Sequence, residues 1–122
     1  MHREQNTVTI EQRSFEFAGL VVHSCRILFR NHDYDLARQL LRAGTSIGAN
    51  VHEAQAALTK REFIAKMSIA AKEARETDYW LRLLASQGIL DSVPARDQLL
   101  TEIVTIQKIL TSIIKTAQQN LK

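Results

Sequence analysis

Apolar residues recur at helical spacing along most of this chain, and very little in the sequence interrupts them. Its 122 residues include one proline and four glycines, so long helices meet few breaks. Four segments each carry a stripe of apolar residues three or four positions apart, and short polar turns separate them. We therefore predict an all-α fold, an antiparallel up-down-up-down four-helix bundle.

The first helix is predicted to run from Ser14 to about Asn31. Residues 1–13 are mostly polar and lack the apolar run of a signal peptide, so we expect a flexible N-terminal lead-in. Residues 14–122 then form a single bundle domain. Cys25 lies in the apolar stripe of this helix, which predicts an inert, buried thiol. The whole stripe comprises Ala18, Val21, Val22, Cys25, Leu28 and Phe29.

The second helix is predicted to begin after an N-cap at Asp33 or Asp35 and to end near Leu58. Gly44 and Gly48 lie four residues apart in its interior, where each glycine costs about 1 kcal/mol relative to alanine. We expect a neighbouring helix to approach the pair so closely that a side chain would block it. The core seam is predicted to consist of Leu36, Leu40, Ala43, Ile47, Val51, Ala54 and Leu58.

The third helix is predicted to begin at a capping box, in which Thr59 and Glu62 each bond a backbone N–H of the first turn. Because the connection is so short, this helix should lie antiparallel to the second. It should end near Gly88. Its predicted core stripe comprises Phe63, Met67, Ala70, Ala74, Thr77, Leu81 and Leu84.

The last helix is predicted to carry Pro94 in its first turn, where a missing N–H costs little. Its seam comprises Leu99, Ile103, Ile106, Leu110, Ile113, Ala117 and Leu121, and further apolar residues widen it: Leu100, Val104, Ile109 and Ile114. A monomeric bundle cannot bury so wide an apolar surface. We therefore expect the chain to assemble with copies of itself.

Composition and motif spacing argue against several functional classes. Hydrophobic residues make up 45% of the chain, but no stretch approaches the roughly 20 apolar residues of a membrane span. The single cysteine suits a reducing cytoplasm. The four histidines are scattered, no Glu-x-x-His motif occurs, and Gly44–Gly48 lacks the lysine of a phosphate-binding loop. We predict a non-catalytic cytoplasmic protein without metal or cofactor.

A polar stripe runs along the second and third helices outside their core seams, and we call it the interhelical polar stripe. It comprises Arg42, Ser46, Asn50, Glu53, Lys66, Glu73, Glu76 and Trp80. Antiparallel packing should bring Glu53 level with Lys66, Ser46 with Glu73, and Arg42 with Glu76. Arg38 should reach the level of Trp80 and could stack on it. We favour a hydrogen-bonded lattice that fixes helix register over a ligand or catalytic site, because buried charges need partners.

The net charge of +3 and the isoelectric point near 9.3 permit a nucleic-acid partner. Basic residues that should lie outside the core seams are the candidate phosphate contacts. They are Arg26, Arg30, Lys60, Arg61 and Arg75.

Two segments carry a resemblance to a known family. They are the run Gln39–Ala54, and the pattern Phe63-Ile64, Lys66, Ala70, Lys72-Glu73-Ala74, Glu76-Thr77 and Tyr79-Trp80-Leu81. Together they resemble the bacterial four-helix-bundle family encoded in 23S rRNA intervening sequences. The resemblance implies a homopentameric ring with a central channel. This family is related to the accessory variability proteins of diversity-generating retroelements, which bind nucleic acid through a basic ring surface.

Three hypotheses follow for the function. The first is a homo-oligomeric module that binds structured RNA or DNA through a basic surface. The second is a protein-binding scaffold without a nucleic-acid role, using Leu20, Ile27 and the broad apolar surface of the last helix. The third, which we rank lowest, is a small-ligand site near Asn50 in the interhelical polar stripe.

Overall fold

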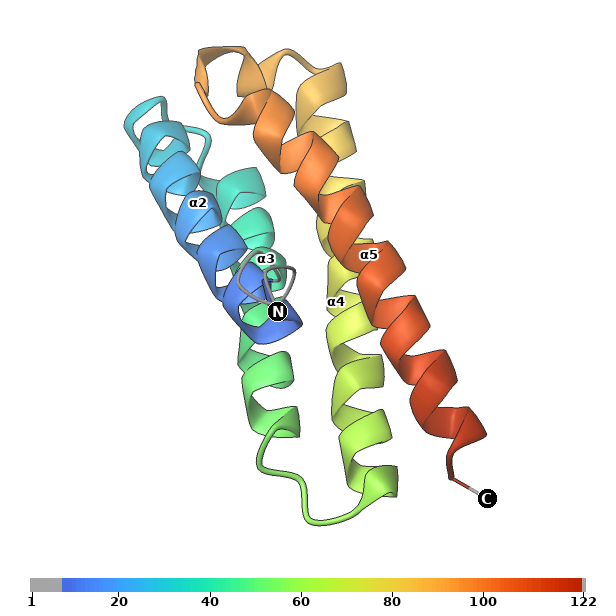
Figure 1. Ribbon diagram of the computed structural model, residues 1–122. Coiled ribbons are helices and arrows are strands. Elements are labelled where there is room, and N and C mark those ends of the chain that lie inside the picture. Colours follow the sequence, from blue (N-terminus) through green and yellow to red (C-terminus); the bar gives the residue numbers. More distant parts are fainter. Residues whose placement is uncertain (1–7, 122) are drawn as a thin grey trace.

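The computed structural model describes residues 8–121, and within that range it contains four α-helices and no β-strand. The helices are α2 (Ile10–Arg30), α3 (Tyr34–Ala54), α4 (Lys60–Ser86) and α5 (Arg96–Gln119), and a short 3-10 helix, η1 (Ile89–Ser92), precedes α5. Each helix packs against the next one along the chain, and α5 also contacts α2 (Figure 1). The all-α prediction is confirmed.

The first helix begins four residues earlier than predicted, so the expected boundary at residues 13 and 14 falls inside α2. The Thr9 hydroxyl accepts a hydrogen bond of 3.0 Å from the backbone N–H of Gln12, which caps the helix. Arg13 then reaches α5, where its guanidinium lies 3.1 Å from the Glu102 carboxylate. Residues 10–13 are therefore structured. Residues 1–7 of the predicted lead-in lie outside the described residues.

The connection from α2 to α3 is a tight turn in which His32 adopts a left-handed backbone conformation, with φ of 66°. The Asn31 side-chain amide donates to the Ser92 hydroxyl at 2.9 Å and so ties this turn to η1. Asp33 occupies the N-cap position of α3, as predicted, but its side chain makes no capping hydrogen bond.

The second helix ends at Ala54, four residues before the predicted end at Leu58. The Leu58 side chain is 93% exposed, so its assignment to the core was wrong. The backbone tightens after Ala54, because the N–H groups of Ala56 and Ala57 donate to carbonyl oxygens three residues back. Thr59 accepts from the N–H of Glu62, as predicted, and the Glu62 carboxylate accepts from the N–H of Leu58 at 2.9 Å. Because that N–H bonds a side chain, Leu58 belongs to the linker.

The glycine pair of α3 marks a close approach of α2. A Cβ atom at Gly44 would lie 2.9 Å from both γ-methyl carbons of Val21. A Cβ atom at Gly48 would lie 3.1 Å from the backbone carbonyl oxygen of Ser14. The predicted reason for the two glycines is confirmed: α2 passes where a side chain of α3 would otherwise stand.

The core lies along the seams where the four helices meet. Most predicted seam residues are fully buried, including Val21, Leu40, Met67 and Leu99. Leu20 and Ile27, which were predicted to face a partner, are half-buried and pack against the core. Each therefore offers less free surface to a partner than an exposed residue would.

The last helix departs from the prediction at both ends. Pro94 lies in the turn after η1, and α5 begins only at Arg96. The seam is buried from Leu99 to Leu110, but Leu121 is 41% exposed. In Figure 1, α2 begins at mid-height, so the C-terminal part of α5 has no α2 beside it. Each helix within residues 8–121 is too short or too polar to cross a lipid bilayer.

Candidate nucleic-acid interface and interhelical polar stripe

The charged members of the interhelical polar stripe pair across α3 and α4 in the predicted register. The Lys66 ammonium donates to the Glu53 carboxylate at 2.7 Å. Arg42 donates to Glu73 at 3.2 Å and also pairs with Glu76. The lower-numbered residue of α3, Arg42, thus pairs with the higher-numbered residues of α4, Glu73 and Glu76.

Trp80 extends the network by one helical turn. Its indole N–H donates to the Glu76 carboxylate at 3.0 Å. This bond, followed by the bond from Arg42, holds the pKa of Glu76 below its ordinary value. The bond to Glu76 in turn raises the pKa of Arg42. Glu76 is thus kept ionised by the Trp80 indole and the Arg42 guanidinium, and its bond to Arg42 helps to fix the register of α3 against α4.

The Glu53–Lys66 pair is partly exposed, with the Lys66 side chain 35% and the Glu53 side chain 58% accessible, and its hydrogen bond shifts both pKa values. The hydrogen bond from Lys66 lowers the pKa of Glu53, and the same bond raises the pKa of Lys66. An ion pair this exposed orients α3 against α4 but adds little to the free energy of unfolding.

The two uncharged polar residues of the stripe serve their own helix. Ser46 donates to the carbonyl oxygen of Arg42 at 2.6 Å, and Asn50 donates to that of Ser46 at 2.9 Å. Within residues 8–121 neither makes a side-chain hydrogen bond to α4, so the expected pairing of Ser46 with Glu73 does not form. The back-bonds satisfy both side chains locally, which removes the need for a partner across the interface.

Arg38 does not reach Trp80. It pairs with Asp35 at 3.2 Å, and its guanidinium carbon lies 5.9 Å from the centre of the Tyr34 ring. Both partners lie within one turn of the same helix, so Arg38 meets them at less conformational cost than a residue on α4. The predicted stacking on Trp80 was therefore wrong.

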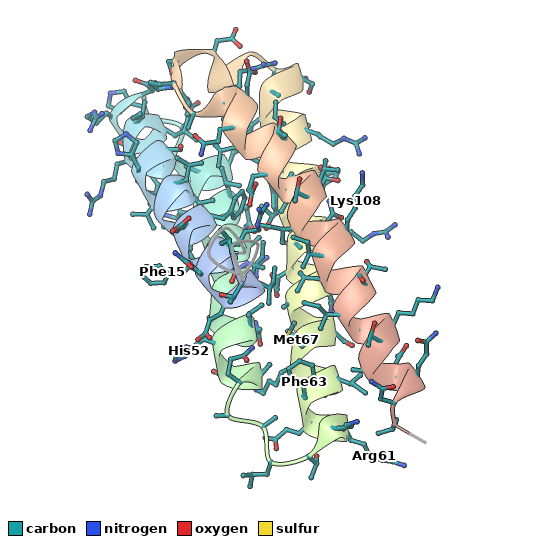
Figure 2. The ribbon with its side chains drawn as sticks, in the orientation of Figure 1. Phe15, His52, Arg61, Phe63, Met67 and Lys108 are labelled. Carbon is teal, nitrogen blue, oxygen red and sulfur yellow. The ribbon has the colours of Figure 1, made fainter. Side chains whose placement is uncertain are left out.

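The five predicted phosphate contacts are all exposed, but they do not form one surface. Arg26 and Arg30 lie in the last turns of α2, whereas Lys60 and Arg61 begin α4 at the opposite end of the bundle (Figures 1 and 2). Lys60 also donates to the carbonyl oxygen of Asn120 at 3.1 Å. Arg75 lies midway along α4. Arg26 and Arg30 are thereby separated from the other three.

A row of exposed basic residues does run along α4, and two of its members were not among the predicted contacts. Exposed residues recur every three or four positions along one face of this helix, and they are Arg61, Ala65, Ser68, Lys72, Arg75, Tyr79, Arg82 and Ser86. This row holds four cations and no acidic residue. We call its cations the α4 basic stripe, defined as Arg61, Lys72, Arg75 and Arg82.

Sequence reasoning missed this stripe because acidic residues stand beside its cations in the sequence. Glu73 and Glu76 neighbour Lys72 and Arg75, but both carboxylates turn toward α3, where Arg42 binds them. The spacing of the cations was a usable signal. The sequence alone did not show that Glu73 and Glu76, which stand beside these cations along the chain, both pair with Arg42.

A groove lies beside the upper part of the stripe, between α4 and α5. Its α4 wall comprises Arg75, Asp78, Tyr79, Arg82, Leu83 and Ser86, and Gln107 closes it from α5. The Asp78 carboxylate lies 4.0 Å from the Arg82 guanidinium. Lys108, the next residue of α5, is exposed and projects outward (Figure 2). Within the described part of the chain, no group of three or more His, Cys, Asp or Glu side chains could hold a metal ion.

The comparisons with known proteins bear directly on the predicted resemblance. The family model described as "23S rRNA-intervening sequence protein" matches residues 6–112. The chain belongs to this family. The family prediction is thus confirmed, while the relation to retroelement proteins stays a prediction.

A solved structure is also similar to this 23S rRNA-intervening sequence protein. It is the crystal structure of a protein of unknown function from the S23 ribosomal protein family of Bacteroides thetaiotaomicron. The two chains are 38% identical, and they superpose with a TM-score of 0.82 over 88% of this chain and 99% of the other. Comparison with curated proteins finds no match.

The segments that carried the family resemblance lie on α3 and α4, the pair of helices that share the interhelical polar stripe. The first contains Arg42 with the two glycines, and the second contains Glu73, Glu76 and Trp80. The signature of this 23S rRNA-intervening sequence protein therefore includes its register-fixing network and a close helix contact.

Proposed function

We propose that this chain is a non-catalytic, homo-oligomeric module that binds structured RNA or DNA through phosphate contacts along the α4 basic stripe. The observation that carries the proposal is the row of four exposed cations on one face of α4. Arg82 has the Asp78 carboxylate 4.0 Å away, and the other three have no acidic group within 4 Å among the described residues. From Arg61 to Arg82 the helix rises about 32 Å, at about 1.5 Å per residue. A row of that length can meet several phosphates of one nucleic-acid strand.

The neighbouring helix extends the positive surface. Lys108 and Lys115 of α5 are exposed and lie seven residues apart, which places them on one side of that helix. Among residues 8–121, neither lies within 4 Å of an acidic group, and the same holds for Arg61, Lys72 and Arg75. These cations are therefore available to phosphate, whereas Arg42 and Lys66 are engaged inside the protein.

The proposed assembly is an antiparallel up-down-up-down bundle whose copies form a homopentameric ring. The register of α3 against α4 supports the antiparallel order, and the family membership supports the ring. Apolar surface on α5 supports self-association, since Val104 is 43% exposed and Leu100, Ile109 and Ile114 are half-buried. A ring would repeat the α4 basic stripe around its surface and strengthen binding through multiple contacts.

The proposal places the protein in the cytoplasm and assigns it no catalytic step. Its one cysteine is buried, with a pKa that burial raises to about 12, which suits a thiol kept reduced and unreactive. The carboxylates of the interhelical polar stripe are bound by cations or an indole. Such groups hold a structure together and are poorly placed to exchange protons with a substrate.

Fluorescence anisotropy with a fragment of 23S rRNA tests the binding at two salt concentrations. We expect affinity at low salt and a steep loss at higher salt, because each phosphate contact releases counterions. Replacing both Arg75 and Arg82 with glutamate should weaken binding by at least tenfold. The matched control replaces Arg26 and Arg30, two exposed arginines on α2, and should change affinity much less. Absence of binding at low salt, or indifference to salt, would refute the proposal.

A protein-binding scaffold is the second candidate, and one observation favours it. Phe15 is 76% exposed on α2, beside a shallow groove lined by apolar atoms of Ala18, Gly48 and Ala49. Pull-down with and without nuclease separates the two candidates. Partners that survive nuclease treatment and disappear with Phe15→Ala would favour the scaffold.

The small-ligand hypothesis loses its support from the side chains. Asn50 bonds its own helix, Glu53 binds Lys66, and Glu73 binds Arg42. A thermal-shift screen with a metabolite panel should therefore give no stabilisation through this stripe.

A further inference from the structure

Tyr79 is an exposed aromatic residue in the middle of the α4 basic stripe. Its side chain is 59% exposed, although a tyrosine that packs inward buries a large apolar surface. Arg75 lies one turn before it and Arg82 one turn after it, on the same face of the helix. All three line the groove between α4 and α5.

The tyrosine ring is held in place from within the protein. It meets the Trp80 ring edge-on, with centroids 5.2 Å apart and planes inclined at 74°. Trp80 in turn donates to Glu76, which Arg42 binds. The interhelical polar stripe thus anchors an aromatic pair whose outer member stays open to solvent.

We infer that Tyr79 is a stacking platform for an unpaired base, so that the preferred ligand of this surface is a single-stranded or bulged nucleotide segment. The inference rests on the proposed nucleic-acid function and names the part of the ligand that the surface selects. A base that stacks on Tyr79 has its flanking phosphates within reach of Arg75 and Arg82, which lie about 10 Å apart along the helix axis. A base inside a duplex cannot offer its face to the ring.

The other groups of the groove are compatible with a base but not with a phosphate at its centre. The Asp78 carboxylate repels phosphate, although Arg82 at 4.0 Å offsets part of its charge. A carboxylate can accept from the amino group of a base, and the Gln107 amide can donate or accept. The base therefore belongs in the groove and the phosphates at its two basic ends.

The test compares three oligonucleotides of one sequence: single-stranded RNA, single-stranded DNA and duplex RNA. We expect at least one single strand to bind the wild-type protein about tenfold more tightly than the duplex. Trp80 is the only tryptophan of the chain and touches Tyr79, so the same titration should quench its fluorescence with single strands. Tyr79→Ala should weaken single-strand binding about tenfold, and Tyr79→Phe should stay within about twofold of wild type.

Phe15→Ala is the matched control, since Phe15 is an exposed aromatic residue on α2 that projects at the left of the view in Figure 2, away from Lys108 of α5. It should bind both single strands as the wild-type protein does. Equal affinity for single strands and duplex, or unchanged single-strand binding by Tyr79→Ala, would overturn the stacking role. If the arginine pair of the stripe still governs affinity in that case, the proposed function stands. Failure of the wild-type protein to bind any of the three at low salt would overturn both.

Discussion

Gly44 of α3 and Val21 of α2 meet without room for one more carbon atom. A Cβ at Gly44 would lie 2.9 Å from each γ-methyl carbon of Val21, and Val21 is fully buried. Carbon atoms that are not bonded normally stay about 3.5 Å or more apart. Gly44 is therefore required for packing, because the close contact with Val21 outweighs the lower helix propensity of glycine.

Gly44→Ala should destabilise the protein by up to about 2 kcal/mol. Overpacking costs roughly 1–3 kcal/mol, and the gain in helix propensity of about 1 kcal/mol offsets only part of it. Chemical denaturation measures the change. In the Val21→Ala background the same substitution should cost at least about 1 kcal/mol less, because the space that Val21 vacates receives the new methyl group.

Gly19→Ala provides the control for the glycine prediction. Gly19 also lies inside a helix, but nothing lies within 4 Å of a Cβ added there. Its replacement should stabilise the protein by about 0.5–1 kcal/mol through helix propensity alone. Equal effects of the two glycine substitutions would refute the packing explanation.

Glu76 should make stability depend on pH on the acid side. Its pKa lies below the ordinary 4.5 in the folded protein, so the carboxylate contributes stability above about pH 4.5. That contribution falls as the pH drops through the lowered folded pKa. Glu76→Gln keeps an acceptor for Trp80 but loses the charge that binds Arg42. It should cost about 0.5–1 kcal/mol at pH 7, since both side chains are more than a third exposed.

Urea denaturation of the wild type and Glu76→Gln at pH 7 and near pH 2 measures this dependence. The difference between the two proteins should shrink on acidification. Glu16→Gln is the control, because within the described residues the Glu16 carboxylate receives a hydrogen bond only from Gln12. An unchanged gap between wild type and Glu76→Gln at both pH values would contradict the linkage.

Cys25 should resist thiol reagents as long as the protein is folded. The side chain is fully buried, and burial raises its pKa to about 12, so almost no thiolate forms at neutral pH. Its thiol also lies 3.5 Å from the carbonyl oxygen of Ala37. Labelling by iodoacetamide at pH 8 should be slow in buffer and rapid in denaturant. Rapid labelling of the native protein would show that α2 opens readily.

Leu58 and Leu40 should respond oppositely to truncation, although the sequence pattern places both in one seam. Leu58→Ser should change stability by less than about 0.5 kcal/mol, because the side chain is 93% exposed. Leu40→Ala should cost about 2–5 kcal/mol, because Leu40 is fully buried. Thermal denaturation of the two variants compares them directly. Similar losses would place Leu58 in an interface between copies.

Local chemistry allowed much of this fold to be predicted. The Thr59–Glu62 capping box forms because both side chains lie within one turn of the N–H groups they bind, and neighbours in sequence suffice to recognise it. The interhelical register followed from the same short connection, which let Lys66 be matched to Glu53 across the two helices. The glycine pair likewise predicted a close contact with a neighbouring helix, but it did not identify that helix as α2.

The errors concern the end of α3 and the start of α2, where the apolar spacing did not indicate the helix boundary. The seam was carried to Leu58, but the Glu62 carboxylate takes the N–H that another helical turn would need. The start of α2 was missed because Thr9 looked like part of a polar lead-in, while its hydroxyl caps Gln12. A side-chain hydrogen bond lies at both places, and the spacing of apolar residues does not reveal such bonds.

The sequence by itself determined which faces of the helices are apolar, and hence the number of helices, while its Gln39–Ala54 run indicated the family. Only the tertiary structure decided that Arg42 binds Glu73 as well as Glu76, and that Lys72 and Arg75 beside them therefore remain exposed for a partner. Arg42 and Arg75 are both arginines on polar faces, yet one is bound by two carboxylates and the other faces solvent. The physical reason is that an ion pair forms between side chains brought together by folding, and the distance between them in the sequence does not reveal it.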